Sequence, residues 1–136
     1  MLRKSIIVVV LVCMFMLLAM FSLAQYNIYK DAEIKIVSLS GDYRIEYVTV
    51  ELPYTYKRYA YVRFIELINP GKVYRSPIAL ADVIDLESFE TKGEVGVVWL
   101  MFDKEKHKFR MGFPQWRESW LNLFISNTPY SAPSNG

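Results

Sequence analysis

The pattern of apolar positions begins with one long run near the amino terminus. It extends from Ile6 to Ala24, and Ser22 is its one strongly polar side chain. A membrane-spanning helix needs about 20 apolar residues, and a helix that is apolar on every side is costly in water. The run therefore predicts a helix in contact with a membrane. The positions we expect to face lipid or form a signal core include Ile6, Val10, Phe15, Leu18, Phe21 and Ala24.

The same run is compatible with a secretory signal or with an uncleaved anchor. Arg3 and Lys4 supply the positive charge that precedes both, and Ser22 and Ala24 are small residues suitably placed for a cut before Gln25. The apolar stretch is slightly longer than a usual signal core and has hardly any polar segment after it, which slightly favours the anchor. In both cases positive residues stay inside, so residues 26–136 are expected outside the cytoplasm.

Beyond the run, alternating patterns predict strands joined by tight turns. Glu33 to Leu39 and Tyr43 to Leu52 flank Ser40-Gly41-Asp42 and read as a hairpin. Tyr54 to Ile68 is apolar on both faces, which is typical of a central strand. Val95 to Phe102 and Lys108 to Phe113 predict a second hairpin.

The remaining segments give weaker signals. Tyr26 to Asp31 is expected to form a short stalk or to lead into the first strand. Val73 to Glu90 is ambiguous, and we expect a short helical turn followed by a strand. Pro114 begins a segment whose tryptophans recur at helical spacing, which predicts an amphipathic helix of about three turns. The polar segment from Asn127 onward predicts a loose tail.

Together these elements predict an α+β fold with one domain. A signal or anchor occupies residues 1–25, and residues 26–127 form an antiparallel sheet of about five strands closed by one carboxy-terminal helix. Residues 128–136 are the predicted flexible tail. The length beyond the apolar run suits one domain rather than two.

Charge excludes one class of function for this domain. Removing Arg3 and Lys4 from the 16 basic residues leaves 14, which equals the number of acidic residues. A nucleic-acid or polyanion binder needs an excess of basic residues, so neither partner is expected. Acidic residues gather between Asp82 and Asp103, and basic residues between Lys104 and Arg117. This uneven placement predicts either two neutralising sheet edges or a dipolar binding surface.

Few residues suit chemistry. Cys13 lies inside the apolar run and His107 is the single histidine, in a lysine-rich turn. Metal sites, cofactor sites and a nucleophilic triad are therefore not expected. Asp85 and Glu87 share one face if their segment is a strand, which keeps a paired-carboxylate hydrolase open as the least favoured alternative.

The expected function is non-enzymatic binding at the cell envelope. Aromatic side chains cluster after Pro53, and tyrosines provide rigid contact area for a protein interface or stack against sugars. We therefore expect an accessory, inhibitor or immunity type of protein that binds another envelope or exported protein, with a polysaccharide-binding module as the alternative. The candidate partner-binding residues are Tyr54, Tyr56, Tyr59, Tyr61, Lys104, Lys106 and Lys108.

Overall fold

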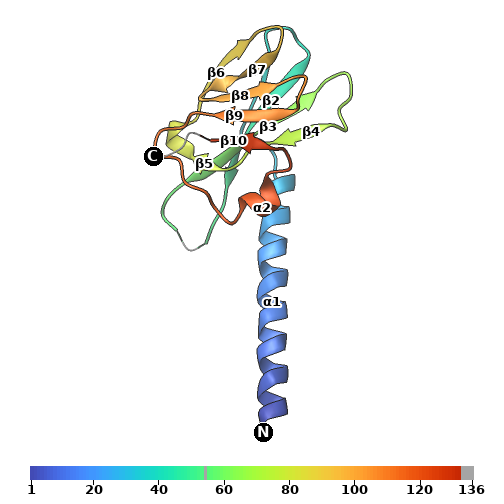
Figure 1. The fold of residues 1–136 in the computed structure, drawn as a ribbon, viewed down its shortest axis with the longest axis vertical. Coiled ribbons are helices and arrows are strands. Elements are labelled where there is room, and N and C mark those ends of the chain that lie inside the picture. Colours follow the sequence, from blue (N-terminus) through green and yellow to red (C-terminus); the bar gives the residue numbers. More distant parts are fainter. Residues whose placement is uncertain (54, 133–136) are drawn as a thin grey trace.

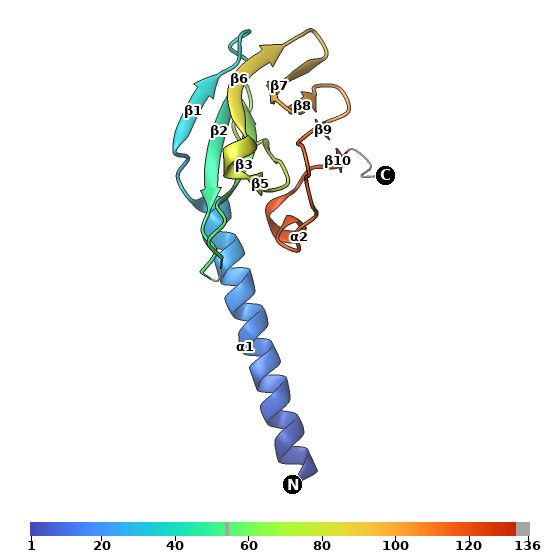
Figure 2. The same ribbon diagram turned by 90° about the vertical axis from the view of Figure 1, so that its left-hand side faces the viewer.

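The computed structural model describes residues 1–53 and 55–132. One long helix, α1 (Leu2–Tyr29), leads into a domain made of two sheets (Figures 1 and 2). The first sheet contains β1 (Ile34–Val37), β2 (Tyr43–Val50), β3 (Tyr59–Glu66), β4 (Val73–Arg75) and β5 (Ala79–Leu80). The second contains β6 (Asp85–Glu90), β7 (Glu94–Val98), β8 (Leu100–Asp103), β9 (Lys108–Met111) and β10 (Tyr130–Ser131). Two short elements, the single 3-10 turn η1 (Ala81–Val83) and α2 (Asn122–Ile125), complete the fold.

The predicted α+β class is confirmed, and so is the first hairpin. β1 and β2 pair in antiparallel register with Ile36 opposite Ile45. Gly41 adopts a φ of +82° in the connecting turn, a conformation that glycine reaches without steric cost. The Gly41 amide donates to the Ser38 carbonyl at 2.9 Å, which closes that turn.

The strands form two sheets rather than the single sheet expected. The segment from Val95 to Phe102 is not one strand, because a tight turn at Val98 and Trp99 folds it back on itself. β7 and β8 then pair with Val97 opposite Leu100. Trp99 has a φ of +66°, and its carbonyl accepts a hydrogen bond from the Gly112 amide at 2.8 Å.

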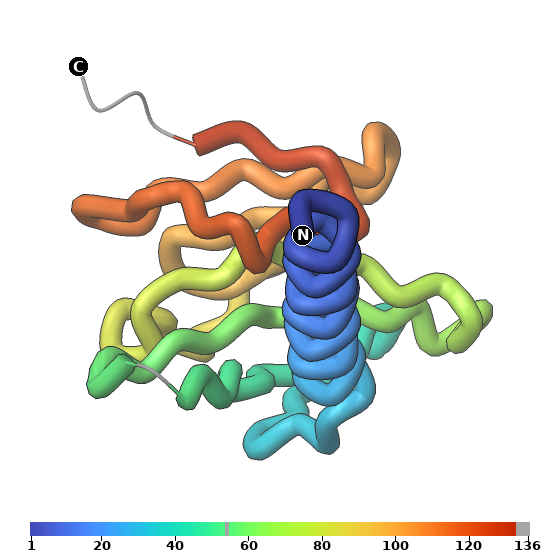
Figure 3. Tube along the Cα trace, turned by 90° about the horizontal axis from the view of Figure 1, so that it is seen from below, coloured from blue at the N-terminus to red at the C-terminus, as the bar shows by residue number. Residues whose placement is uncertain are grey.

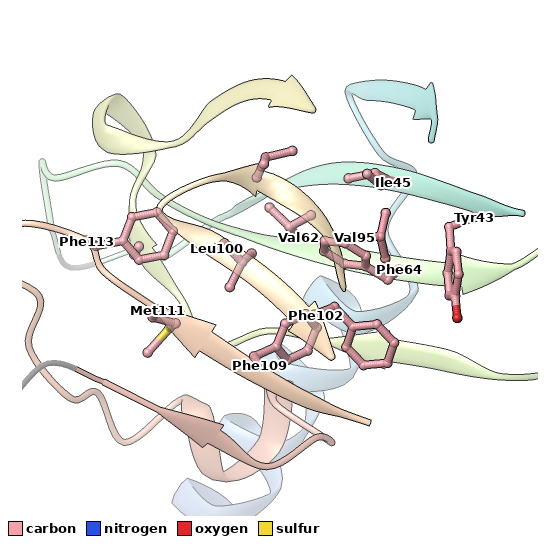
Figure 4. Packing of buried hydrophobic residues seen from close by; sticks show 12 residues of the cluster. Tyr43, Ile45, Val62, Phe64, Val95, Leu100, Phe102, Phe109, Met111 and Phe113 are labelled. Carbon is pink, nitrogen blue, oxygen red and sulfur yellow. The ribbon is translucent and has the colours of Figure 1, made fainter. Parts of the chain in front are cut away.

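The main core lies between the two sheets (Figure 4). Apolar side chains from β2 and β3 meet those of β7, β8 and β9, and Phe102 lies at the centre of several aromatic contacts. Its ring centroid is 5.7 Å from that of Phe64 and 5.2 Å from that of Phe109. Each sheet therefore turns one row of apolar side chains toward the other.

The opposite face of the first sheet carries a second core. Val48, Val50 and Tyr61 pack there with Ile28 from α1 and with Leu121 and Ile125 around α2. Because β3 is apolar on both faces, it is covered on both sides, as expected for a central strand.

The carboxy-terminal segment differs from expectation in two ways. The helix predicted from Pro114 is reduced to α2, one turn long. The Trp116 indole donates to the Ile78 carbonyl at 2.9 Å, and Gln115 has a φ of +55°, so tertiary contacts hold this segment in an irregular path. Part of the expected loose tail is also ordered, since β10 pairs in parallel with β9 and Thr128 is buried.

The ambiguous segment from Val73 to Glu90 contains the expected helical turn and strand. η1 provides the turn and β6 the strand. Two short strands, β4 and β5, precede them and both pair with β3.

Candidate functional site

α1 fits a signal anchor or a membrane span, and it is the one helix of the described residues with that length and apolar character. Its apolar side chains project away from the rest of the chain along most of its length. Of the positions expected in this segment, Ile6, Val10, Phe15, Leu18 and Phe21 are exposed, whereas Ala24 has no exposed surface. The domain therefore begins to cover α1 before the apolar run ends.

The carboxyl end of α1 is joined to the first sheet by the buried side chain of Asn27. Its Oδ1 accepts a hydrogen bond from the Glu51 amide at 2.9 Å, and its Nδ2 donates to the Glu51 carbonyl at 3.4 Å. The same Nδ2 donates to the Leu23 carbonyl at 2.9 Å. One side chain thus pairs with both backbone groups of a residue directly after β2, as a neighbouring strand would.

Two side chains of β3 bind the carbonyl groups that the end of the helix leaves without helical partners. The Tyr61 hydroxyl donates to the Asn27 carbonyl at 2.7 Å. The Arg63 guanidinium donates to the carbonyls of Ile28 at 2.9 Å and Lys30 at 3.0 Å. A positive group at this end also interacts favourably with the helix dipole.

The buried carboxylate of Glu46 compensates the charge of Arg63. Arg63 Nε donates to Glu46 Oε2 at 3.1 Å, and Arg44 Nε lies 3.4 Å from Glu46 Oε1. Burial raises the pKa of the neighbouring Tyr61 hydroxyl, which therefore remains a hydrogen-bond donor. The end of α1 is thus held by a network of charged and neutral hydrogen bonds.

This docking replaces the expected stalk. Tyr26 to Tyr29 belong to α1, and Lys30 then contacts β2 through its Nζ, 2.9 Å from the Thr49 hydroxyl and 3.0 Å from Glu51 Oε1. The helix and the sheet are therefore directly connected, with no flexible spacer between them.

Beside the end of α1 the domain presents a surface that we name the helix-side face. It consists of residues 51–53 and 55–58 of the β2–β3 loop and residues 114–124. Figure 3 shows both stretches, green and orange-red, on one side of α1 in the view from below. α2, at the end of the second stretch, packs against α1.

A groove of about 1060 Å³ opens on this face. Its apolar lining includes Leu52 from the β2–β3 loop, Tyr59 from β3, Ile78 directly before β5, and Trp116 and Trp120 from the segment after β9. The exposed side chains of Lys57 and Arg117 also line it. The groove is of mixed character, because further polar side chains line it as well, namely Thr55, Gln115, Glu118 and Ser119.

The expected tyrosine cluster does not form one binding surface. Tyr56 is fully exposed on the loop, Tyr59 is half-buried at the groove, and Tyr61 is buried under α1. Tyr54 lies outside the described residues. Tyr59 and Tyr61 are two residues apart in β3, so their side chains point to the same face of the sheet, which α1 and α2 cover. Tyr56 lies in the loop before β3 and is not on that face.

The expected lysines lie at the other end of the domain. Lys106 and Lys108 are exposed, whereas Lys104 Nζ donates to Glu90 Oε2 at 2.8 Å and to the Thr91 carbonyl at 2.9 Å. Burial alone raises the pKa of Glu90, but hydrogen bonds from Lys104 and Ser40 outweigh this and lower it to about 2. The acidic and basic stretches therefore pair with each other in part.

The candidate catalytic residues do not line the groove on the helix-side face. Asp85 and Glu87 are exposed on β6, and Asp85 Oδ1 accepts the Glu87 amide at 3.0 Å. His107 is a turn residue with a φ of +51°, and its ring lies 5.1 Å from that of Tyr74. Across residues 1–53 and 55–132, no group of three His, Cys, Asp or Glu side chains is arranged to hold a metal ion.

Sequence reasoning missed a second exposed surface, which we name the far edge. It is formed by β1 and β6, which are the outer strands of the two sheets. Val37, Leu39 and Phe89 are exposed there, and Ser40 joins the strands by donating to Glu90 at 2.6 Å. In the sequence, the one indication of this surface was that apolar Val37 and Leu39 stand next to the predicted turn at Ser40-Gly41-Asp42.

Comparison with known proteins adds no relative, since no family model, curated protein or solved structure matches this chain. The class that the fold defines is a two-sheet α+β domain joined directly to an apolar helix that is compatible with membrane association.

Proposed function

We propose that this chain is a non-enzymatic, single-pass protein of the cell envelope, whose domain binds another envelope or exported protein at the membrane surface. The apolar helix is an uncleaved anchor with its amino end in the cytoplasm. The observation that carries the proposal is the junction of α1 with the first sheet. Asn27, Tyr61 and Arg63 hold the last turn of α1 on the first sheet, and the domain also covers Ala24, the last residue before the candidate cut, so it packs on the apolar run itself.

The partner binds at the far edge. An outer strand carries backbone groups that no neighbouring strand pairs, and an extended segment of another protein can add to it as a further strand. The exposed side chains of Val37 and Leu39 then supply apolar contacts next to the new strand. Lys35 in the middle of β1 favours a partner segment with acidic residues.

Photo-cross-linking in intact cells tests this function. A photoreactive amino acid replaces Leu39 at the far edge or, as the control, Lys108 on the outer side of the second sheet; both positions are exposed. We expect one discrete protein adduct from position 39 that disappears when Val37→Glu is added. Position 108 gives no such adduct.

Two results contradict the proposal. The first is the absence of a protein adduct from position 39. The second is an equal adduct from position 108, which moves binding to the turn between β8 and β9. The anchor is tested separately by the mass of the protein purified from membranes, because cleavage before Gln25 removes 24 residues.

A further inference from the structure

We infer that the helix-side face is a lipid-binding surface, and that its groove takes an anionic phospholipid from the leaflet into which α1 inserts. This inference rests on the proposed anchoring of α1 and adds a ligand class and a site to it. Three independent features of the face support it: its depth relative to the apolar run, its exposed side chains, and the lining of the groove.

The depth follows from the burial of α1. Ala24 has no exposed surface, and Met20 and Leu23 are partly covered. These residues belong to the apolar run, and its 19 residues from Ile6 to Ala24 span about 28 Å as a helix. Since the hydrocarbon layer is about 30 Å thick, the whole run is needed to cross it. The part of the domain that covers Met20 to Ala24 therefore reaches the boundary between the headgroups and the hydrocarbon layer.

The direct junction keeps the face at that depth. A domain on a flexible stalk can move away from the bilayer, but here Asn27 and Arg63 bind the last turn of α1 to the first sheet. Figure 1 shows α2 and the β2–β3 loop beside the upper turns of the helix. The helix-side face must then meet lipid whenever α1 spans the membrane.

The exposed side chains of the face suit a membrane interface. Leu123 is 83% exposed and Tyr56 is fully exposed, and the Trp120 ring lies 6.1 Å from that of Phe124. Aromatic rings are favoured at headgroup depth, where one side is apolar and the other hydrated. Basic side chains on the same face attract anionic headgroups; these are Lys57, Arg58 and Arg117.

The groove fits one lipid of this kind. Its volume of about 1060 Å³ lies at the upper end of the range for small-molecule sites. Leu52, Ile78 and Trp116 offer apolar contact for acyl-chain carbons, and Lys57 and Arg117, which also line the groove, offer cations for a phosphate. Glu118 also lines the groove, and its carboxylate accepts the Tyr130 hydroxyl at 2.7 Å.

Quenching by labelled lipids in nanodiscs tests the surface. The full chain with Cys13→Ser carries one new cysteine, Leu123→Cys or Leu39→Cys, labelled with nitrobenzoxadiazole. The two leucines are matched in exposure, at 83% and 74%, but lie at opposite ends of the domain. The quencher is phosphatidylcholine or phosphatidylglycerol with a nitroxide on the acyl chain. We expect strong quenching at position 123 and none at position 39.

A second arm tests the preference for anionic lipid. At equal mole fraction, phosphatidylglycerol should quench position 123 more than phosphatidylcholine, with a local enrichment of about fivefold per cation at low salt. Lys57→Gln with Arg117→Gln should lower that preference to the level that Arg58 alone supports, and because both substituted side chains are exposed the fold should be unaffected. Equal quenching by the two lipids in the unsubstituted chain overturns the anionic ligand.

A label at position 15 separates failure of this inference from failure of the anchor. Phe15→Cys lies in the middle of the apolar run. Quenching at 15 without quenching at 123 overturns the lipid-binding face and leaves the anchor intact. No quenching at 15 means that α1 does not enter the bilayer, which overturns the anchor and the inference together.

Discussion

Replacing Asn27 with alanine removes the side chain that pairs α1 with the backbone after β2. The Glu51 amide then loses its acceptor, and the Glu51 carbonyl loses a donor. Leaving such partly buried groups without partners costs about 1–3 kcal/mol. Alanine is a better helix former than asparagine, which returns about 0.5 kcal/mol. We therefore expect Asn27→Ala to lower the free energy of unfolding by about 1–2 kcal/mol.

The assay is urea unfolding of the full chain in detergent micelles, followed by tryptophan fluorescence. Tryptophans are absent from α1, so the signal reports the domain. Tyr26→Ala is the matched control, because Tyr26 is on the same helical turn and exposed. Asn27 and Tyr26 both precede the first strand. In the folded and in the urea-unfolded state of the domain, α1 stays in the micelle. The control should change stability by less than about 0.5 kcal/mol.

Equal midpoints for Asn27→Ala and the unsubstituted chain would refute the reasoning. Such a result would mean that the hydrogen bonds to Glu51 contribute nothing net and that the helix end is not held by them. Hydrogen exchange at the Glu51 amide gives an independent readout, since loss of the Asn27 acceptor should increase its exchange rate if the junction is as described.

Three further predictions use the same unfolding assay. Arg63→Met should cost about 3 kcal/mol, because Glu46 is buried and loses its closest cation; a loss below 1 kcal/mol would contradict this. Glu90 is more acidic in the folded chain, with a pKa of about 2, so its stabilising effect is complete above its ordinary pKa and is lost as pH falls from about 5 toward 2. Glu90→Gln should flatten that acid dependence, and an unchanged pH profile would exclude the assignment. Gly96→Ala should cost more than about 2 kcal/mol, because a Cβ there lies 2.8 Å from the Met101 Cα, whereas Gly93→Ala meets open space and should be nearly neutral.

The first hairpin was predictable because local chemistry fixes it. Ser40-Gly41-Asp42 encodes the turn, and the alternation in Tyr43 to Val50 encodes the strand. The apolar run was equally plain. In both cases residues close in the chain decide the structure, and neighbours far away only confirm it.

The predicted second hairpin is present as β8 and β9, but the turn between β7 and β8 was missed because it contains no residues typical of a turn. Val98 and Trp99 are among the residues least typical of a turn, and Trp99 takes a positive φ that is uncommon for an aromatic side chain. The Gly112 amide and the packing of the indole beside Gly112 stabilise that conformation. Both of these contacts involve Gly112, which directly follows β9. The residues next to Trp99 in the sequence therefore do not indicate the turn.

The carboxy-terminal helix failed for a related reason. Tryptophans at helical spacing predict a helix, but the same side chains find partners that require another path. Trp116 donates to Ile78 and packs edge-on against Tyr130. Contacts between distant residues thus override a local periodicity, and they create the groove that no local pattern predicts.

The candidate site was the least predictable part, because the junction joins residues far apart in the chain. Asn27 follows the apolar run and is a poor helix former, but this alone does not identify it as a junction residue. Its partner Glu51 is 24 residues away, and the Arg63 that binds Ile28 is 35 residues away. The predicted tyrosines include one true member of the junction, Tyr61, but as a buried support for the helix and not as a binding residue.

The direct junction also restricts which partners can reach the far edge. β2 has 8 residues and spans about 26 Å, and it runs from the Leu39 end of the domain to the end that meets α1. If lipid covers the helix-side face, the far edge is held within about 30 Å of the bilayer surface. A rigid binder gains affinity from such preorganisation only for partners whose binding segment lies at the same height. This geometry favours a partner that is itself held at the membrane surface, and in that case moving the domain outward by a flexible insertion after Tyr29 should weaken its cross-linking at position 39.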